Sequence, residues 1–144
     1  FMEVFDCLPL AAIISDDQKS IFCVNGGITS ELKTISQLEE IERPLKIPPT
    51  GLIHDILYAN PKSSKNNNGC VFGPKMVHRF LKNNKLDSII RSHQCQKGGY
   101  NFPFGYDDQS VLSIFSCPHY DKEHRVGAAA YVRDSMLYTI KTVA

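Results

Sequence analysis

The chain has 144 residues, of which 42% are hydrophobic and 22% are charged. These fractions are typical of one globular domain and exclude intrinsic disorder, a collagen-like chain and a coiled coil. There are 16 Lys and Arg residues against 15 Asp and Glu, a formal net charge of +1. No strong field therefore indicates nucleic acid as a partner, and no apolar run approaches the roughly 20 residues that span a bilayer.

Cysteine usage and the start of the chain indicate the compartment and the completeness of the sequence. The five cysteines never stand in a Cys-x-x-Cys spacing, and three lie in apolar runs. We therefore expect reduced core thiols in an intracellular, cytoplasmic protein. The first residue is Phe1, within an apolar stretch and without an initiator Met or a basic leader, so we expect a fragment of a longer sequence. The cysteines are Cys7, Cys23, Cys70, Cys95 and Cys117.

Two short apolar runs near the start predict a hairpin. Residues 10–14 and 21–24 are separated by a polar segment, and we expect both strands to be buried on two faces. The second run ends at residues 25–27, Asn-Gly-Gly, a turn in which glycine permits close approach to the backbone. Capping-box spacing at Ser36 then predicts a short helix that runs to Arg43 and is stopped by Pro44.

The middle of the chain predicts two more helices around a polar loop. Apolar residues at helical spacing place one helix over residues 51–58. Residues 62–69 are polar throughout and are expected to form an exposed loop. Pro74 suits the first position of the next helix, which carries a stripe of Val77, Phe80 and Leu81 and ends at residues 83–84.

The second half of the chain predicts mainly strands. Short apolar periods occur at residues 88–92, 100–104, 111–115, 128–132 and 137–143, and Asp134-Ser135 offers a tight turn before the last of them. Helices followed by antiparallel hairpins indicate a mixed α/β protein of the layered α+β kind, with sheets inside and helices outside.

Three polar loops follow predicted strands and are the candidates for a functional site. They comprise residues 25–27, 91–94 and 116–120, and loops that leave one edge of a sheet are where sites are usually assembled. Each signal is open to a structural interpretation, since a single histidine such as His93 is often a hydrogen-bonded structural residue. No nucleophile elbow, phosphate-binding glycine loop or paired zinc-ligand spacing occurs.

Several motifs, taken together and in order, resemble a known family. They are Phe5-Asp6-Cys7-Leu8-Pro9, Phe22-Cys23-Val24-Asn25-Gly26-Gly27, Arg43-Pro44, Arg91-Ser92-His93-Gln94 and Phe115-Ser116-Cys117-Pro118-His119-Tyr120. This series resembles the C-terminal half of a phosphoprotein-phosphatase-family serine/threonine phosphatase, nearest to the type 1 catalytic subunit. The resemblance implies that residues 1–144 form a single partial domain, the C-terminal half of a calcineurin-like metallophosphatase β-sandwich flanked by helices.

The resemblance also implies a site with two divalent metal ions, Mn or Fe/Zn, that is degenerate here. His93 stands where the family has one metal-ligating histidine, whereas Asn25 replaces another. Asn68 takes the place of the arginine that binds the substrate phosphate. Tyr120 keeps the tyrosine that borders the active site, although His119 replaces the asparagine before it. The motifs that carry the family's remaining ligands are absent from this sequence.

Two hypotheses follow for activity. An amide oxygen is a poor donor to a transition metal, and loss of the arginine removes a charge-assisted contact to phosphate, so we predict a catalytically inactive phosphatase-like subunit with a structural or scaffolding role in a larger assembly. The alternative is one part of an active metal-dependent phosphatase whose N-terminal half is missing from this chain, in which Asn25 still ligates weakly.

Partner binding is a further expectation of the resemblance. In type 1 phosphatases a hydrophobic groove receives Arg-Val-x-Phe-like peptides, which add a strand to the sheet edge. A partial sandwich also exposes apolar surface that other protein must cover, so we expect protein partners. The positions that match the groove are Ile21, Ser88, Phe102, Met136, Tyr138 and Ile140, with Ser88 in the place of a leucine and Tyr138 in that of a cysteine. The alternative interpretation is that these are ordinary sheet and core residues.

Overall fold

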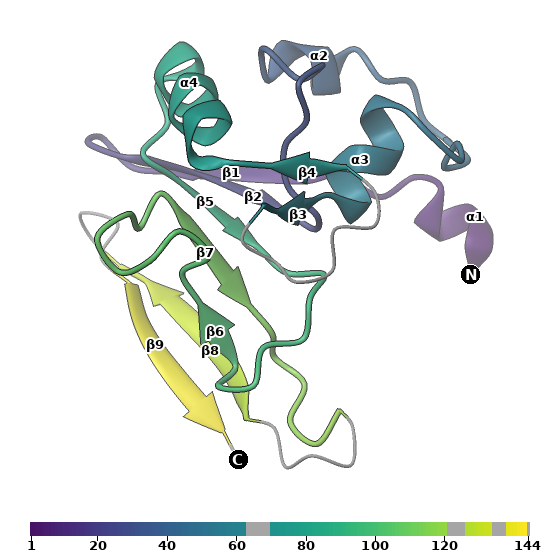
Figure 1. The fold of residues 1–144 in the computed structure, drawn as a ribbon. Helices are drawn as coiled ribbons and strands as arrows, with labels where there is room; N and C mark the ends of the chain where they lie inside the picture. The colour runs from purple at the N-terminus through teal and green to yellow at the C-terminus, as the bar shows by residue number, and fades with distance from the viewer. Residues whose placement is uncertain (63–69, 121–125, 134–137, 144) are drawn as a thin grey trace.

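The computed structural model describes residues 1–62, 70–120, 126–133 and 138–143, without the side chain of Tyr138 (Figure 1). In this part of the chain the helices are α1 (Met2–Phe5), α2 (Ser36–Glu39), α3 (Leu52–Tyr58) and α4 (Pro74–Asn84). The strands are β1 (Ala11–Ser15), β2 (Ser20–Val24), β3 (Asn60–Pro61), β4 (Val71–Phe72), β5 (Ser88–Arg91), β6 (Tyr100–Asn101), β7 (Val111–Ile114), β8 (Gly127–Val132) and β9 (Tyr138–Val143).

A five-stranded sheet with the order β1-β2-β5-β7-β6 forms the centre of the fold. Strands β2, β5 and β7 are parallel, while β1 and β6 pair antiparallel at the two sides. Because parallel strands end on the same side, the segments that follow β2, β5 and β7 meet there. We call this place the strand-end edge: residues 25–27, 92–94 and 115–120.

Two smaller sheets complete the fold. Strands β3 and β4 pair in parallel, and β8 and β9 form an antiparallel hairpin. The hairpin is attached to the central sheet through the hydrogen bond from Ala128 N to Phe115 O, at 2.9 Å. In Figure 1 this hairpin lies at the opposite end of the molecule from α2 and α4. The mixed architecture predicted from the sequence is therefore confirmed.

The main core lies between the central sheet and helices α3 and α4. Phe22 on β2 packs against Phe80 on α4, with 5.3 Å between ring centroids. Helix α4 has Pro74 at its start and a left-handed residue, Lys85, at its C-cap, in agreement with the predicted bounds. The predicted stripe is buried, and the buried cluster comprises Phe22, Val24, Ile28, Leu32, Ile56, Ala59, Phe72, Val77, Phe80, Leu81, Ile89 and Val111.

The hairpin β1–β2 forms as predicted, but the burial of β1 was predicted wrongly. Ile13 and Ile14 are 45% and 40% exposed. The reason is the position of β1 at the side of the sheet, where it pairs with β2 alone among the described strands. The sequence pattern of β1 is that of a covered strand, so the exposure leaves a partly apolar surface on this side of the sheet.

Other boundaries also differ from the predictions. The helix that begins at Ser36 ends at Glu39, short of Arg43. Strand β6 has only two residues, because the chain turns at Phe102, whose oxygen accepts a hydrogen bond from Gly105 N. The turn predicted at residues 134–135 and the polar loop at 63–69 lie outside the described residues.

The cysteines are free thiols, but they are not core residues. Cys7 and Cys117 are exposed, and Cys23, Cys70 and Cys95 are half-buried. The core position was predicted from the short apolar runs around several of them. The two exposed cysteines lie outside the strands, in the connections before β1 and after β7. No helix among the described residues has both the length and the apolar composition needed to cross a bilayer.

Candidate functional site at the strand-end edge

The structure brings Asn25 and the loop that contains His93 together at the strand-end edge. Val24 and Arg91 are register partners on β2 and β5, and Ser92 N donates to Asn25 O at 3.0 Å. Tyr120 follows β7, is 63% exposed, and contacts Phe115 edge-on at 5.1 Å between ring centroids. The edge borders an open groove of about 600 Å³, lined mainly by apolar residues together with Asn25, Arg91, Ser92 and Ser116.

The turn after β2 is pressed against the end of α3. Gly26 N and Gly27 N both donate to Ile56 O, at 2.9 and 3.1 Å. A Cβ atom on Gly26 would lie 2.5 Å from the backbone of Leu57, so only glycine fits this contact. The close backbone approach expected from the Asn-Gly-Gly sequence is confirmed, and what approaches is the helix end.

Asn25 is tied to the same helix by its side chain. Its Nδ2 atom donates to Leu57 O at 2.8 Å. The amide nitrogen therefore faces α3, while the residue as a whole stays exposed. The sequence analysis treated Asn25 as a turn residue and as a replaced metal ligand, and it missed this contact with α3.

The buried side chain of Arg91 connects several segments at the strand-end edge through hydrogen bonds. The sequence analysis did not assign it a role. It is 1% exposed. Nε donates to Gly26 O, Nη1 donates to Gln94 Oε1 at 2.8 Å and to Ser113 Oγ at 3.5 Å, and Nη2 donates to Ala59 O at 3.3 Å. Burial lowers the pKa of Arg91 to about 10, so the guanidinium stays charged at neutral pH. Arg91 stands two positions after buried Ile89 on β5. Residues two apart in a strand point to the same face, so the sequence could have indicated that Arg91 points inward.

His93 lies two residues after the end of β5 and has a left-handed backbone conformation, with φ of 65°. Its ring meets Tyr58 edge-on at 5.5 Å between centroids, and Tyr58 in turn contacts His54 at 4.9 Å. Partial burial and the charge of Arg91 lower the pKa of His93. A lowered pKa favours the neutral imidazole, which is the form that binds metals.

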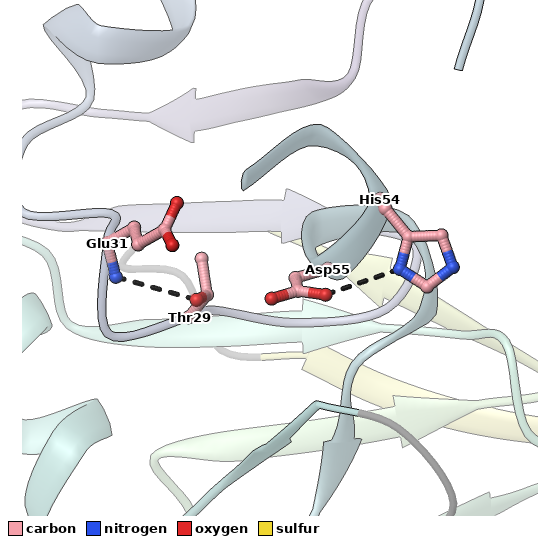
Figure 2. Close-up of polar contacts among 4 residues, drawn as sticks. All are labelled: Thr29, Glu31, His54 and Asp55. Carbon is pink, nitrogen blue, oxygen red and sulfur yellow. Dashed lines mark hydrogen bonds and ion pairs between the residues drawn. The ribbon is translucent and has the colours of Figure 1, made fainter. Parts of the chain in front are cut away.

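A second group of polar residues, shown in Figure 2, comprises His54 and Asp55 on α3 and Thr29 and Glu31 in the segment that follows β2. Asp55 Oδ1 is 3.2 Å from His54 Nδ1, and Thr29 Oγ1 accepts a hydrogen bond from Glu31 N at 3.5 Å. Burial and the hydrogen bond with Asp55 raise the pKa of Cys70. A thiol that stays protonated is a poor nucleophile.

The donors that the structure describes do not fit the two-metal centre implied by the resemblance. Among residues 1–62, 70–120, 126–133 and 138–143, no three His, Cys, Asp or Glu side chains come together in a way that could hold a metal ion. The strand-end edge contains two imidazoles, His93 and His119, and the amide of Asn25, whose nitrogen donates to the end of α3. Asn68, the third predicted site residue, lies outside the described residues.

The predicted peptide groove is placed only in part. Ile21 and Ser88 are register partners on β2 and β5, but Ile21 is 1% exposed and Phe102 is 8% exposed, which leaves little of either for a peptide to contact. Ile140 is half-buried on β9. Met136 and the side chain of Tyr138 are outside the described part, so the groove stays a prediction.

Comparison with known proteins defines the class. Residues 1–97 match the calcineurin-like phosphoesterases, and because this is more than half of the chain, the protein belongs to that family. Among solved structures it is similar to a protein serine/threonine phosphatase from Saccharomyces cerevisiae, described as having similarity to human phosphatase PP5, with 29% sequence identity and a TM-score of 0.83.

The match to the yeast phosphatase covers different shares of the two chains. It covers 97% of the present chain but 48% of the yeast phosphatase chain, so the protein spans about half the length of that relative. The serine/threonine-phosphatase resemblance and the metallophosphatase fold inferred from the sequence are confirmed. The finer likeness to a type 1 catalytic subunit stays a prediction.

Proposed function

We propose that this protein is a serine/threonine-phosphatase-like subunit that does not hydrolyse phosphoesters by itself and has a structural role in a larger assembly. The observation that carries the proposal is the amide of Asn25, whose nitrogen is bonded to Leu57 O at the position of a family metal ligand. Two-metal hydrolysis needs both ions to activate water and to neutralise charge on the phosphoryl group. An amide supplies at most a weak oxygen donor for a transition metal.

Metal binding and hydrolysis by the full chain test this proposal. The wild-type protein is titrated with Mn²⁺ and with Zn²⁺ by calorimetry and is assayed on a phosphoserine peptide. We expect neither two equivalents of tightly bound metal nor turnover above buffer. Metal binding and hydrolysis by Asn25→His are compared with those of the control Asn101→His. Asn101 suits the control because it is exposed and its side chain makes no hydrogen bond among the described residues. Stoichiometric binding of two ions together with hydrolysis by the wild type would overturn the proposal.

The second candidate function is one part of an active phosphatase. It is favoured by the coverage of only 48% of the yeast phosphatase chain and by the Asn25 oxygen, which the bond to Leu57 O leaves available to ligate weakly. In that case the remaining ligands come from the other half of the domain. Metal analysis of the protein purified from its natural source decides between the two: two ions per molecule support the enzyme, and their absence supports the structural subunit.

Protein partners are part of the same proposal. The half-buried apolar residues Cys23, Ile90 and Ile114 line the open groove beside the sheet, and covering such a surface favours association. We also propose that the protein binds Arg-Val-x-Phe-like peptides. A titration with such a peptide tests them, with Phe102→Ala as the variant and Phe5→Ala as the control, since Phe5 is exposed on α1. Binding that is absent, or equal in both variants, would dispose of the groove.

A further inference from the structure

The last carbonyl groups of a helix have no partners within the helix and need donors from elsewhere. At the end of α3 several of those donors come from the turn after β2 and from the end of β5. Ile56 O accepts from Gly26 N and Gly27 N, Leu57 O accepts from Asn25 Nδ2 at 2.8 Å, and just beyond the helix Ala59 O accepts from Arg91 Nη2. The turn after β2 is therefore the C-terminal cap of α3.

We infer that Asn25 acts as a side-chain cap for α3 that fixes the geometry of the strand-end edge without a cation. The inference rests on the proposed function, because it assigns a structural task to the residue that replaces a metal ligand. Ser92 N donates to Asn25 O, so the same residue joins the end of β5 to the end of α3. In the family, metal ions are expected to hold these segments together. In this protein, hydrogen bonds of Asn25 join them.

A cap for α3 requires a hydrogen-bond donor at position 25, whereas a metal ligand requires an electron-pair donor. This difference allows the two roles to be tested separately. Leu57 O can only accept a hydrogen bond, so the nitrogen of the Asn25 amide must face it. An aspartate has the same shape but offers only oxygen when ionised, and the C-terminal end of a helix carries partial negative charge. Asn25→Asp thus creates a better metal ligand and a worse cap, and the two roles predict opposite effects on the same variant.

Amide hydrogen exchange in the full chain, with excess chelator, tests the cap. The probes are the amides of Gly26, Gly27 and Ser92, and Asn101→Asp is the matched control, because Asn101 is the exposed residue of β6. We expect exchange at the three probes to be about three- to tenfold faster in Asn25→Asp than in the wild type, the effect of losing one net hydrogen bond, and unchanged in Asn101→Asp. Equal exchange in Asn25→Asp and wild type would overturn the inference.

Two further arms keep the test decisive. Should Asn25→Asp not accumulate as folded protein, Asn25→Ala removes the donor without adding charge, and unchanged exchange in that variant overturns the cap equally. Addition of Mn²⁺ to the wild type must leave the three probes unaltered, whereas a marked slowing of their exchange would show that a cation sets the edge. Because the first arm is measured in chelator, the cap can fail there even if the protein proves to bind no metal.

Discussion

The contact between Gly26 and the end of α3 gives the sharpest prediction. A Cβ atom at position 26 would lie 2.5 Å from Leu57 C, 2.5 Å from Tyr58 N and 2.7 Å from Ala59 N. All three are backbone atoms, so no side chain can rotate away to relieve the overlap. Gly26→Ala must push the turn away from α3 and lengthen the two hydrogen bonds that Ile56 O accepts.

The cost follows from these contacts. Overpacking a tight contact costs about 1–3 kcal/mol, and each of the two weakened hydrogen bonds contributes roughly 1 kcal/mol. We therefore expect the free energy of unfolding of Gly26→Ala to fall by about 3–5 kcal/mol, a large part of the roughly 5–15 kcal/mol of a typical domain.

Urea unfolding monitored by circular dichroism measures this change. Gly98→Ala is the matched control, because a Cβ atom there meets nothing within 4 Å, and we expect it to be neutral or stabilising by up to about 1 kcal/mol. A loss of less than about 1 kcal/mol in Gly26→Ala would refute the reasoning, since it would mean that α3 and the turn separate at little cost.

Three other changes test the rest of the structure. Arg91→Met leaves the acceptors around the buried guanidinium without donors and should cost at least about 3 kcal/mol in urea unfolding; a loss below about 1 kcal/mol would contradict its organising role. Phe80→Ala empties the contact with β2 and should cost about 3–5 kcal/mol in the same assay, and a smaller cost would mean that the core collapses around it. Burial raises the pKa of Asp108, but hydrogen bonds from Ser110 and His78 outweigh it and lower that pKa overall. Asp108 therefore stabilises the fold above its unfolded pKa of about 3.9, and this small contribution disappears as the pH falls through the lowered value. Asp108→Asn should remove that part of the pH dependence of Tm, and an unchanged profile would contradict it.

The elements that the sequence predicted well are those with strong local signals. Helix α4 was predicted from Pro74 and from the stripe of Val77, Phe80 and Leu81, because a proline start and a helical period are properties of neighbouring residues. The hairpin of β1 and β2 was predicted for the same reason. Burial of β1 was not, because it depends on what covers Ile13 and Ile14, and a hydrophobic period says nothing about which strand lies at the side of a sheet.

The neighbourhood of the loops that contain Asn25 and His93 was predicted, but the contacts of their side chains were not, and their role in a site stays a prediction. Parallel strands place the ends of β2 and β5 together, so grouping Asn25 with His93 followed from loop positions. The roles of Asn25 and Arg91 depend on contacts with Leu57 and Ala59, which are more than 30 positions away from them. Such contacts leave no periodic signal in one sequence. Family resemblance pointed to position 25 through what was lost there, and only the structure showed what the new side chain does.

The connectivity of the central sheet also bears on how the chain assembles. Ser20, at the start of β2, bonds Asp87 across 67 positions of sequence, so the parallel pairing of β2 with β5 requires closure of a long loop. Each antiparallel hairpin, by contrast, joins strands that are neighbours in the chain. Loop closure delays non-local pairings. We therefore expect β1–β2 to form early and the β2–β5 junction, with the edge it creates, to appear late on the folding pathway.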